Sequence, residues 1–174
     1  MNIPALITGS IVIIVFSWFY SVKGKRYHGI PRLFAFESIL ILVLLNITHW
    51  FSTPFSWNQI ISLILLALSA WVGIAGYVTL YRKGKAEGDF ENTTVLVRSG
   101  VYGIIRHPLY LSLLLIGTSI MMIKLTLPSI IAGLVNLIAL GVTAYIEEKE
   151  MVEKFGQQYN DYMKETKMFI PFIL

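Results

Sequence analysis

Long stretches without a charged side chain alternate with short polar segments along this 174-residue chain. Residues 1–22 contain no Asp, Glu, Lys, Arg or His, and residues 38–81 contain only His49 from that group. A transmembrane helix needs roughly 20 consecutive apolar residues. The first stretch therefore has the length of one span, and the second has the length of two.

Five transmembrane helices follow from this pattern. We expect them at residues 3–22, 33–50, 59–81, 109–123 and 125–146. Turn-forming residues separate the second span from the third, and Pro128 permits a tight reversal between the fourth and the fifth. The fourth span is short. It can begin earlier, at His107 and Pro108, because the N–H that proline lacks is unbonded in the first turn of any helix.

Composition and charge indicate an all-α integral membrane protein and give it an orientation. Hydrophobic residues make up 56% of the chain, charged residues make up 14%, and the mean hydropathy is +0.70. Of the 14 lysines and arginines, all except Lys124 lie in residues 23–32, 82–108 or the tail after residue 146. The positive-inside rule therefore predicts an outside N-terminus and a cytoplasmic C-terminus. We expect a multi-pass protein of the cell inner membrane if the source is prokaryotic.

Several classes of function are disfavoured. The chain has no cysteine, which excludes disulfides, thiolate nucleophiles and cysteine-based zinc sites, and we expect no metal. The net charge of +4 follows from topology, so we expect no nucleic-acid partner. Residues 1–22 lack a positive n-region and a cleavage site, and we interpret them as a retained helix. We expect residues 1–174 to form a single membrane domain, with three spans in residues 1–81 and the sequence motifs described below in residues 82–171. The sequence does not indicate the oligomeric state.

The first three spans carry few residues that suggest chemistry. Small residues that let helices approach closely lie in the third span: Ser69, Gly73 and Gly76. Glu37 lies one turn into the second span, where it could pair with Arg32 or extend to the membrane surface. His28 is expected in a loop. The role of these spans stays open.

The tail from residue 147 to residue 167 has the pattern of an interfacial helix. Val152, Phe155, Tyr159 and Tyr162 recur at offsets of 0, 3, 7 and 10, which forms one apolar-aromatic stripe. Charged residues lie mostly elsewhere on that helix. We expect the stripe to rest on the membrane surface.

The predicted topology brings two polar features to one membrane face. The first is the corner at Arg106 and His107, at the mouth of the fourth span, and the second is Glu147–Glu148, where the fifth span ends. Arg106 and His107 could instead only anchor a helix end to lipid phosphates, and the glutamates could only terminate a span. Adjacent helical residues point about 100° apart, so only one glutamate need act on a given ligand atom.

The ordered set of motifs resembles the isoprenylcysteine carboxyl methyltransferases and their phospholipid methyltransferase relatives. The matching residues are Leu96-Val97, Gly100, Tyr102, Arg106-His107-Pro108, Tyr110, Glu147-Glu148, Phe155-Gly156, Tyr159, Tyr162 and Ile170-Pro171. The resemblance covers roughly residues 94 to 171. It implies methyl transfer from S-adenosylmethionine to a lipophilic small molecule or membrane lipid.

Carried over position by position, the resemblance implies a donor site and a catalytic corner. The implied donor-binding residues are Thr94, Val95, Leu96, Val97, Tyr102, His107, Pro108, Leu109, Tyr110, Glu147 and Glu148, and the implied catalytic residues are Arg106 and His107. A carboxylate suits the ammonium group of the donor, and aromatic faces suit its sulfonium. We expect replacement of Glu147 to abolish donor binding and replacement of Glu148 to be better tolerated.

The sequence departs from the carboxyl methyltransferase pattern on the acceptor side. Thr143 stands where an arginine is expected to hold the substrate carboxylate, and Gly103 stands where a basic residue is often found. Arg98 or Lys167 could substitute for that arginine if the fold brings one of them close. The acceptor therefore stays open, with carboxyl O-methylation favoured over N-methylation.

Two other classes of function compete with methyl transfer. A sterol-reductase-like enzyme that uses NADPH would resemble the same C-terminal region, but this chain is small for that class. A non-enzymatic transporter or scaffold is the third possibility. Transporters usually place ionisable groups near the middle of the membrane, and here only Glu37 approaches that description.

Overall fold

Six α-helices form the described part of the chain in a computed structural model. The described residues are 2–22, 26–50, 52, 56–85 and 93–171. The helices are α1 (Ile3–Ser17), α2 (Gly29–Asn46), α3 (Trp57–Lys83), α4 (Pro108–Ile123), α5 (Leu127–Phe155) and α6 (Gln157–Glu165). A π-helical turn, Trp18–Val22, extends α1, and 3₁₀ turns lie at Ile47–His49 and Gly100–Gly103.

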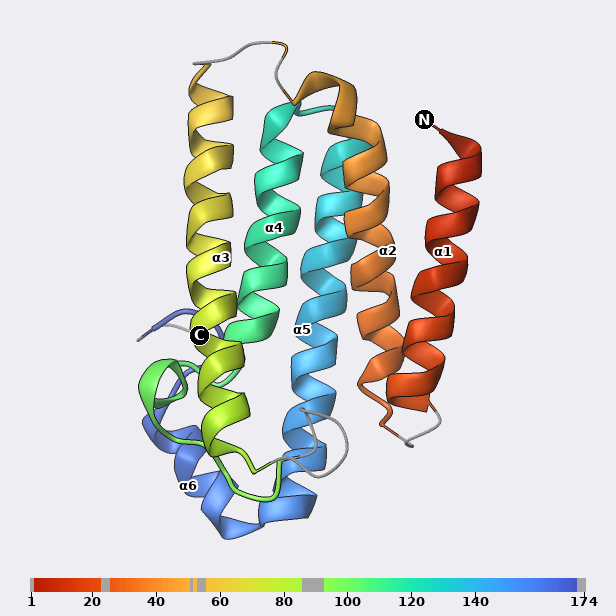
Figure 1. Cartoon of the computed structure of the whole chain (residues 1–174). Coiled ribbons are helices and arrows are strands. Elements are labelled where there is room, and N and C mark those ends of the chain that lie inside the picture. Colours follow the sequence, from red (N-terminus) through yellow and green to blue (C-terminus); the bar gives the residue numbers. More distant parts are fainter. Residues whose placement is uncertain (1, 23–25, 51, 53–55, 86–92, 172–174) are drawn as a thin grey trace.

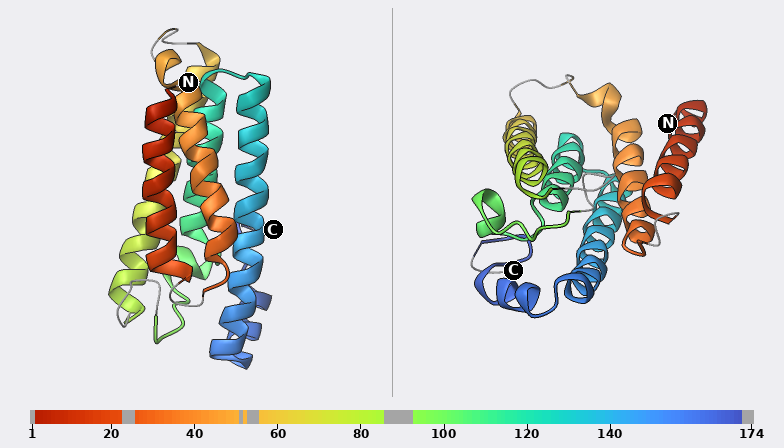
Figure 2. Two further views of the ribbon diagram at one scale, coloured as in Figure 1. Left: turned by 90° about the vertical axis from the view of Figure 1, so that its right-hand side faces the viewer. Right: turned by 60° about the horizontal axis from the view of Figure 1, so that its bottom comes forward.

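The first five helices lie side by side as one bundle, and α6 crosses one end of it (Figure 1). Helix α1 is outermost and lies beside α2 (Figure 2). Four stretches are long and apolar enough to cross a membrane: Ile3–Ser21, Gly29–His49, Trp57–Lys83 and Leu127–Phe155. Helix α4 is shorter, at 16 residues. The protein is thus all-α and integral to the membrane, and its orientation stays a prediction.

Local sequence explains where the helices begin. The side chain of Ser56 accepts a hydrogen bond from the backbone N–H of Gln59 at the start of α3 (3.3 Å). Thr126 does the same for Ser129 at the start of α5 (3.4 Å). Such caps satisfy N–H groups that a helix leaves unbonded in its first turn. Helix α4 begins at Pro108, as expected from the fixed backbone angle of proline.

Small residues bring α3 and α4 together, as predicted. The hydroxyl of Ser69 donates to the backbone carbonyl of Ser112 (2.8 Å). A Cβ atom on Gly73 would lie 3.1 Å from the hydroxyl oxygen of Ser112, and one on Gly76 would lie 3.2 Å from the ring of Pro108. The glycines therefore allow α3 to approach the start of α4, where the polar corner lies.

Helices α2 and α5 enclose buried amides. Asn136 of α5 donates to the backbone carbonyl of Ala35 (3.2 Å), and Asn46 of α2 donates to the hydroxyl of Ser129 (3.3 Å). Leu42 and Leu140 are fully buried in the bundle. Large hydrophobic side chains on the outer faces remain exposed, as a surface in contact with lipid requires.

The C-terminal tail differs from its prediction as a single interfacial helix. Helix α5 continues past the expected end at residue 146 to Phe155, and Gly156, with φ of +57°, separates it from α6. Glycine suits this left-handed backbone because it has no Cβ. Tyr159 and Tyr162 are buried against the rest of the protein, so their half of the predicted stripe does not rest on the membrane surface.

Candidate functional site

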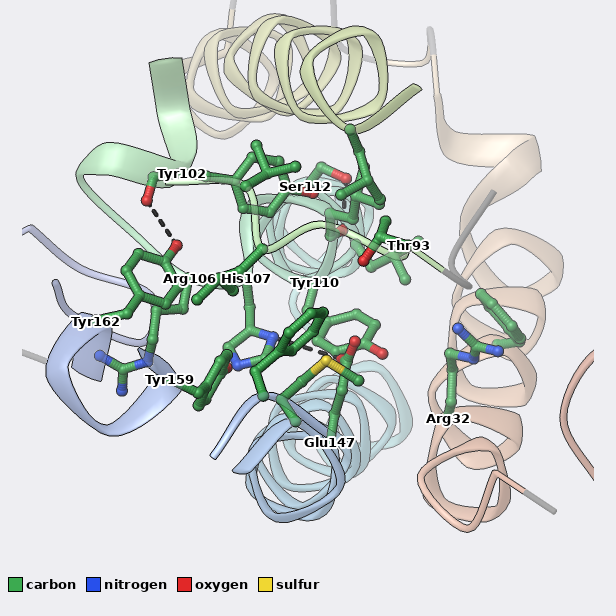
Figure 3. Close-up of a pocket in the computed structure, with 18 of the residues that line it drawn as sticks. Arg32, Thr93, Tyr102, Arg106, His107, Tyr110, Ser112, Glu147, Tyr159 and Tyr162 are labelled. Carbon is green, nitrogen blue, oxygen red and sulfur yellow. Dashed lines mark hydrogen bonds and ion pairs between the residues drawn. The ribbon is translucent and has the colours of Figure 1, made fainter. Parts of the chain in front are cut away.

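A cavity of about 300 Å³ lies at the end of the bundle that α6 crosses. Every helix contributes to its wall, together with the connecting segment 93–107 (Figure 3). Most of the bordering side chains are apolar or aromatic, and a few polar groups lie among them. A largely apolar cavity with few polar groups is the usual form of a small-molecule site.

The segment 93–107 is held in place by the tail of the chain. The backbone N–H groups of Arg106 and His107 donate to the carbonyls of Lys167 (2.8 Å) and Met168 (3.2 Å). The phenol of Tyr162 donates to the carbonyl of Tyr102 (2.6 Å). Residues after α6 thus form part of the scaffold on which the polar corner is built.

The guanidinium of Arg106 links the polar corner to α5 and to the C-terminal end of α6. Its Nε donates to Glu148 Oε1 (2.6 Å), and its Nη1 donates to the carbonyls of Met163 (3.4 Å) and Thr166. Figure 3 shows the side chain directed toward α6. Arg106 borders the cavity, but its charged group is committed to Glu148 and to the end of α6.

His107 lies between the two glutamates. Its Nδ1 is 3.5 Å from Glu147 Oε2, and its Nε2 is 3.2 Å from Glu148 Oε1. Its ring stacks on Tyr110, with centroids 5.4 Å apart and planes 10° apart. The divergence of adjacent helical residues therefore lets both carboxylates reach one imidazole from opposite sides. Burial opposes the charged imidazole, but the hydrogen bonds with Glu147 and Glu148 and the negative charges of both carboxylates together outweigh burial and raise the pKa of His107.

The structure brings most of the expected donor-binding residues to the cavity. Those that border it are Leu96, Val97, Tyr102, His107, Leu109, Tyr110 and Glu147. Thr94 and Val95 are exposed and outside its lining, and Pro108 is buried against α3. Glu148 is also outside the lining, and it pairs with Arg106.

Other cavity residues were missed by sequence reasoning. They are Phe16, Arg32, Phe36, Leu80, Thr93, Ser112, Leu113, Met151, Phe155, Tyr159 and Tyr162. Phe155, Tyr159 and Tyr162 belong to the motif set but were not assigned to the site. Met151 and Phe155 also follow Glu147 at intervals of four residues and so share its helix face. No local pattern linked the residues of α1 and α2 to the site.

The expected substitutes for an arginine at position 143 do not border the cavity. Thr143 is fully buried and donates to the carbonyl of Ala139 in its own helix (2.7 Å). Arg98 forms an exposed ion pair with Glu165 (2.5 Å), and Lys167 is exposed. The acceptor side must therefore be sought on other helices.

His28 lies in the turn before α2, as expected, but its contacts were not indicated by the sequence, and the alternative that pairs Glu37 with Arg32 was wrong. His28 is buried, and its Nδ1 lies 2.6 Å from Glu150 Oε2 of α5. Its backbone N–H also donates to Glu150 Oε1 (3.2 Å), so this carboxylate ties the start of α2 to α5. Glu37 accepts from the hydroxyl of Ser10 (2.8 Å), whereas Arg32 donates to the hydroxyl of Ser21 (2.8 Å).

Comparison with known proteins gives the family. The family model for phospholipid methyltransferases matches residues 57–158, which include the whole of α3, α4 and α5 and the polar corner. The chain belongs to this family. Methanethiol S-methyltransferase of Pseudomonas deceptionensis is 24% identical over 168 residues, which are 95% of this chain and 57% of that protein.

A second relative matches over a shorter range at higher identity. Protein-S-isoprenylcysteine O-methyltransferase of Tribolium castaneum is 40% identical over 82 residues, which are 45% of this chain and 28% of that protein. The chain thus spans about half the length of one curated relative and less than a third of the other.

Proposed function

We propose that this protein transfers a methyl group from S-adenosylmethionine to a lipophilic acceptor at the membrane. The observation that carries the proposal is the position of Glu147 and His107 on an aromatic-lined cavity within the region that matches the family. Both curated relatives are methyltransferases by name, which supports methyl transfer over the reductase and transporter alternatives.

The residues on the cavity wall fit the methyl donor chemically. Glu147 offers a carboxylate, about one quarter exposed, for the ammonium group of the donor. Tyr102, Tyr110 and Tyr159 offer aromatic faces that attract a cationic sulfur. When bound, S-adenosylmethionine supplies an electrophilic methyl group on that sulfur. Leu96 and Val97 help the cavity to exclude water, which would compete as a nucleophile.

The contacts of His107 favour an acceptor that needs no general base. This imidazole would be the candidate base for an amine, but both of its ring nitrogens face carboxylates. An ionised carboxylate or thiolate attacks without losing a proton during the reaction. Carboxyl O-methylation is the favoured reaction, and the thiol acceptor in the name of the methanethiol relative makes S-methylation the second candidate.

Isothermal titration calorimetry with S-adenosylhomocysteine tests the donor assignment on purified protein in detergent. We expect the wild type to bind and Glu147→Gln to bind at least about tenfold more weakly, because a charge-assisted hydrogen bond is lost. Glu165→Gln is the matched control, since its carboxylate lies on the exposed Arg98 pair. Absence of binding by the wild type would refute the donor.

A labelled-donor assay against a membrane lipid extract tests the acceptor. The labelled product is treated with alkali, which releases methanol from a methyl ester but not from an N-methyl lipid or a thioether. We expect volatile label from the favoured reaction. Label that stays bound through alkali would exclude carboxyl O-methylation.

A further inference from the structure

Four glutamates lie close together near the end of α5, at positions 147, 148, 150 and 153. Any accessible carboxylate among them could attract an ammonium group, so the packing of each one decides which is left for a ligand. Glu148 pairs with Arg106 at 2.6 Å and is 12% exposed. Glu153 is exposed and outside the cavity lining. The remaining two, Glu147 and Glu150, are about one helical turn apart.

Glu150 is bound by His28, the residue that precedes the first turn of α2. The imidazole Nδ1 lies 2.6 Å from Glu150 Oε2, and the backbone N–H of His28 donates to Glu150 Oε1 (3.2 Å). One residue thus contacts both oxygens of the carboxylate. The carboxylate also lies at the N-terminus of α2, where the helix dipole favours negative charge. The side chain of His28 is only 4% exposed, so water has little access to this contact.

The imidazole contacts Glu150 through one defined nitrogen. An ionised carboxylate only accepts hydrogen bonds, so Nδ1 of His28 is the donor. The other ring nitrogen, Nε2, is buried and has no hydrogen-bond partner among the residues that the structure describes. The polar contact of this side chain with α5 is therefore made by Nδ1.

The contact with His28 leaves Glu147 as the carboxylate that faces the cavity. Its side chain is 24% exposed, borders the cavity and lies 3.5 Å from His107 Nδ1 (Figure 3). Like charges three residues apart on a helix repel each other, so an unpaired Glu150 would repel Glu147 and compete with it for an ammonium group. His28 prevents this because it binds both oxygens of Glu150. His28 also lies close enough to Glu147 for the two side chains to interact electrostatically.

Two partly or fully buried pairs hold this part of α5 from different sides. Glu148 joins it to the polar corner through Arg106, and Glu150 joins it to the start of α2 through His28. Positions 148 and 150 point about 200° apart around the helix, and Glu147 projects from the face between them. A side chain on a helix that is fixed in this way loses less freedom when it binds a ligand.

We propose that His28 is a positioning residue of the donor site, which binds Glu150 and thereby keeps Glu147 in place for the ammonium group of S-adenosylmethionine. This inference rests on the proposed function for its ligand. His28 does not border the cavity, so its effect on the donor passes through α5. It also lies outside the range 57–158 that matches the family model.

The test compares two ligands that differ at the end that carries the ammonium group. S-adenosylhomocysteine has the amino-acid group, and 5′-methylthioadenosine lacks it. Isothermal titration calorimetry measures both affinities on the full chain in detergent for the wild type, His28→Asn and His28→Gln. The amide nitrogen of asparagine occupies the place of imidazole Nδ1, whereas that of glutamine reaches the place of Nε2. The controls are Glu153→Gln on the same helix and His49→Gln at the other end of α2.

We expect His28→Gln to weaken S-adenosylhomocysteine about fivefold or more, while 5′-methylthioadenosine and both controls change less than about twofold. His28→Asn keeps a donor to Glu150 and should stay within about twofold of the wild type for both ligands. In a Glu147→Gln background, adding His28→Gln should cause no further loss, because the carboxylate that His28 positions is absent.

Several results would overturn the inference. Equal loss of both ligands in His28→Gln would indicate a general structural role for His28. Equal losses in His28→Asn and His28→Gln would exclude the contact through Nδ1. Unchanged affinity for S-adenosylhomocysteine in His28→Gln, or a further loss in the Glu147→Gln background, would exclude an effect through Glu147. Failure of the wild type to bind S-adenosylhomocysteine would refute the proposed function separately.

Discussion

The pair formed by Arg106 and Glu148 makes a strong prediction about stability. The two side chains are only 9% and 12% exposed, and their atoms meet at 2.6 Å. Glu148 Oε1 also contacts His107. Glu148→Gln removes the charge from this position while it keeps the size and one hydrogen-bond acceptor. We therefore expect a loss of stability with little effect on donor binding.

The expected loss of stability in Glu148→Gln follows from the burial of the ion pair. Removing one partner of a buried ion pair costs about 3–5 kcal/mol, because the other charge is left uncompensated. The glutamine can still accept one hydrogen bond from Arg106, so we expect the free energy of unfolding to fall by about 2–3 kcal/mol. The Arg98–Glu165 pair is the matched comparison, at 38% and 66% exposure. Glu165→Gln should cost no more than about 1 kcal/mol.

Unfolding in SDS, followed by tryptophan fluorescence in mixed micelles, measures both free energies. A double-mutant cycle with Arg106→Gln isolates the pair from the other contacts of each residue. A coupling energy below about 0.5 kcal/mol, or equal effects of Glu148→Gln and Glu165→Gln, would refute the reasoning. A large loss of S-adenosylhomocysteine affinity in folded Glu148→Gln would contradict the expected separation of roles.

Two further changes test the packing around the site. Tyr162→Phe removes the hydroxyl that donates to the buried carbonyl of Tyr102, and it should lower the free energy of unfolding by about 1–3 kcal/mol in the same SDS assay. Amide exchange across residues 93–107 should become faster. Unchanged stability would argue against that hydrogen bond. Gly117→Ala places a Cβ 2.5 Å from Asn136 Oδ1 and should lower the free energy of unfolding by about 1–3 kcal/mol. A Cβ on Gly141 meets nothing within 4 Å, so Gly141→Ala should be neutral or stabilising by up to about 1 kcal/mol. Equal effects of the two substitutions would show that the clash at Gly117 is relieved.

The spans were predictable, but the end of the last one was not. Hydropathy reports where a helix can contact lipid, and residues 147–155 are too polar for that. Glutamate, lysine and methionine are nevertheless good helix formers, so α5 continues until Gly156. The apolar-aromatic stripe in the tail correctly indicated amphipathic helical structure. Periodicity could not indicate whether its apolar face would meet lipid or protein.

The candidate site was partly predictable for a similar reason. Topology brought the corner at Arg106 and His107 to the same face as Glu147, and the motif resemblance supplied the nearby cavity residues of 96–110. The contributions of α1 and α2 depended on packing between spans far apart in sequence. Nothing near Arg32 or His28 indicated that each would be buried close to α5.

The backbone contacts between the polar corner and the tail have a consequence for biosynthesis. Segment 93–107 leaves the ribosome before α4 and α5, yet its N–H groups at Arg106 and His107 bond to carbonyls at Lys167 and Met168. The nascent chain therefore carries an incomplete candidate site, and the site can form only after translation has passed residue 168.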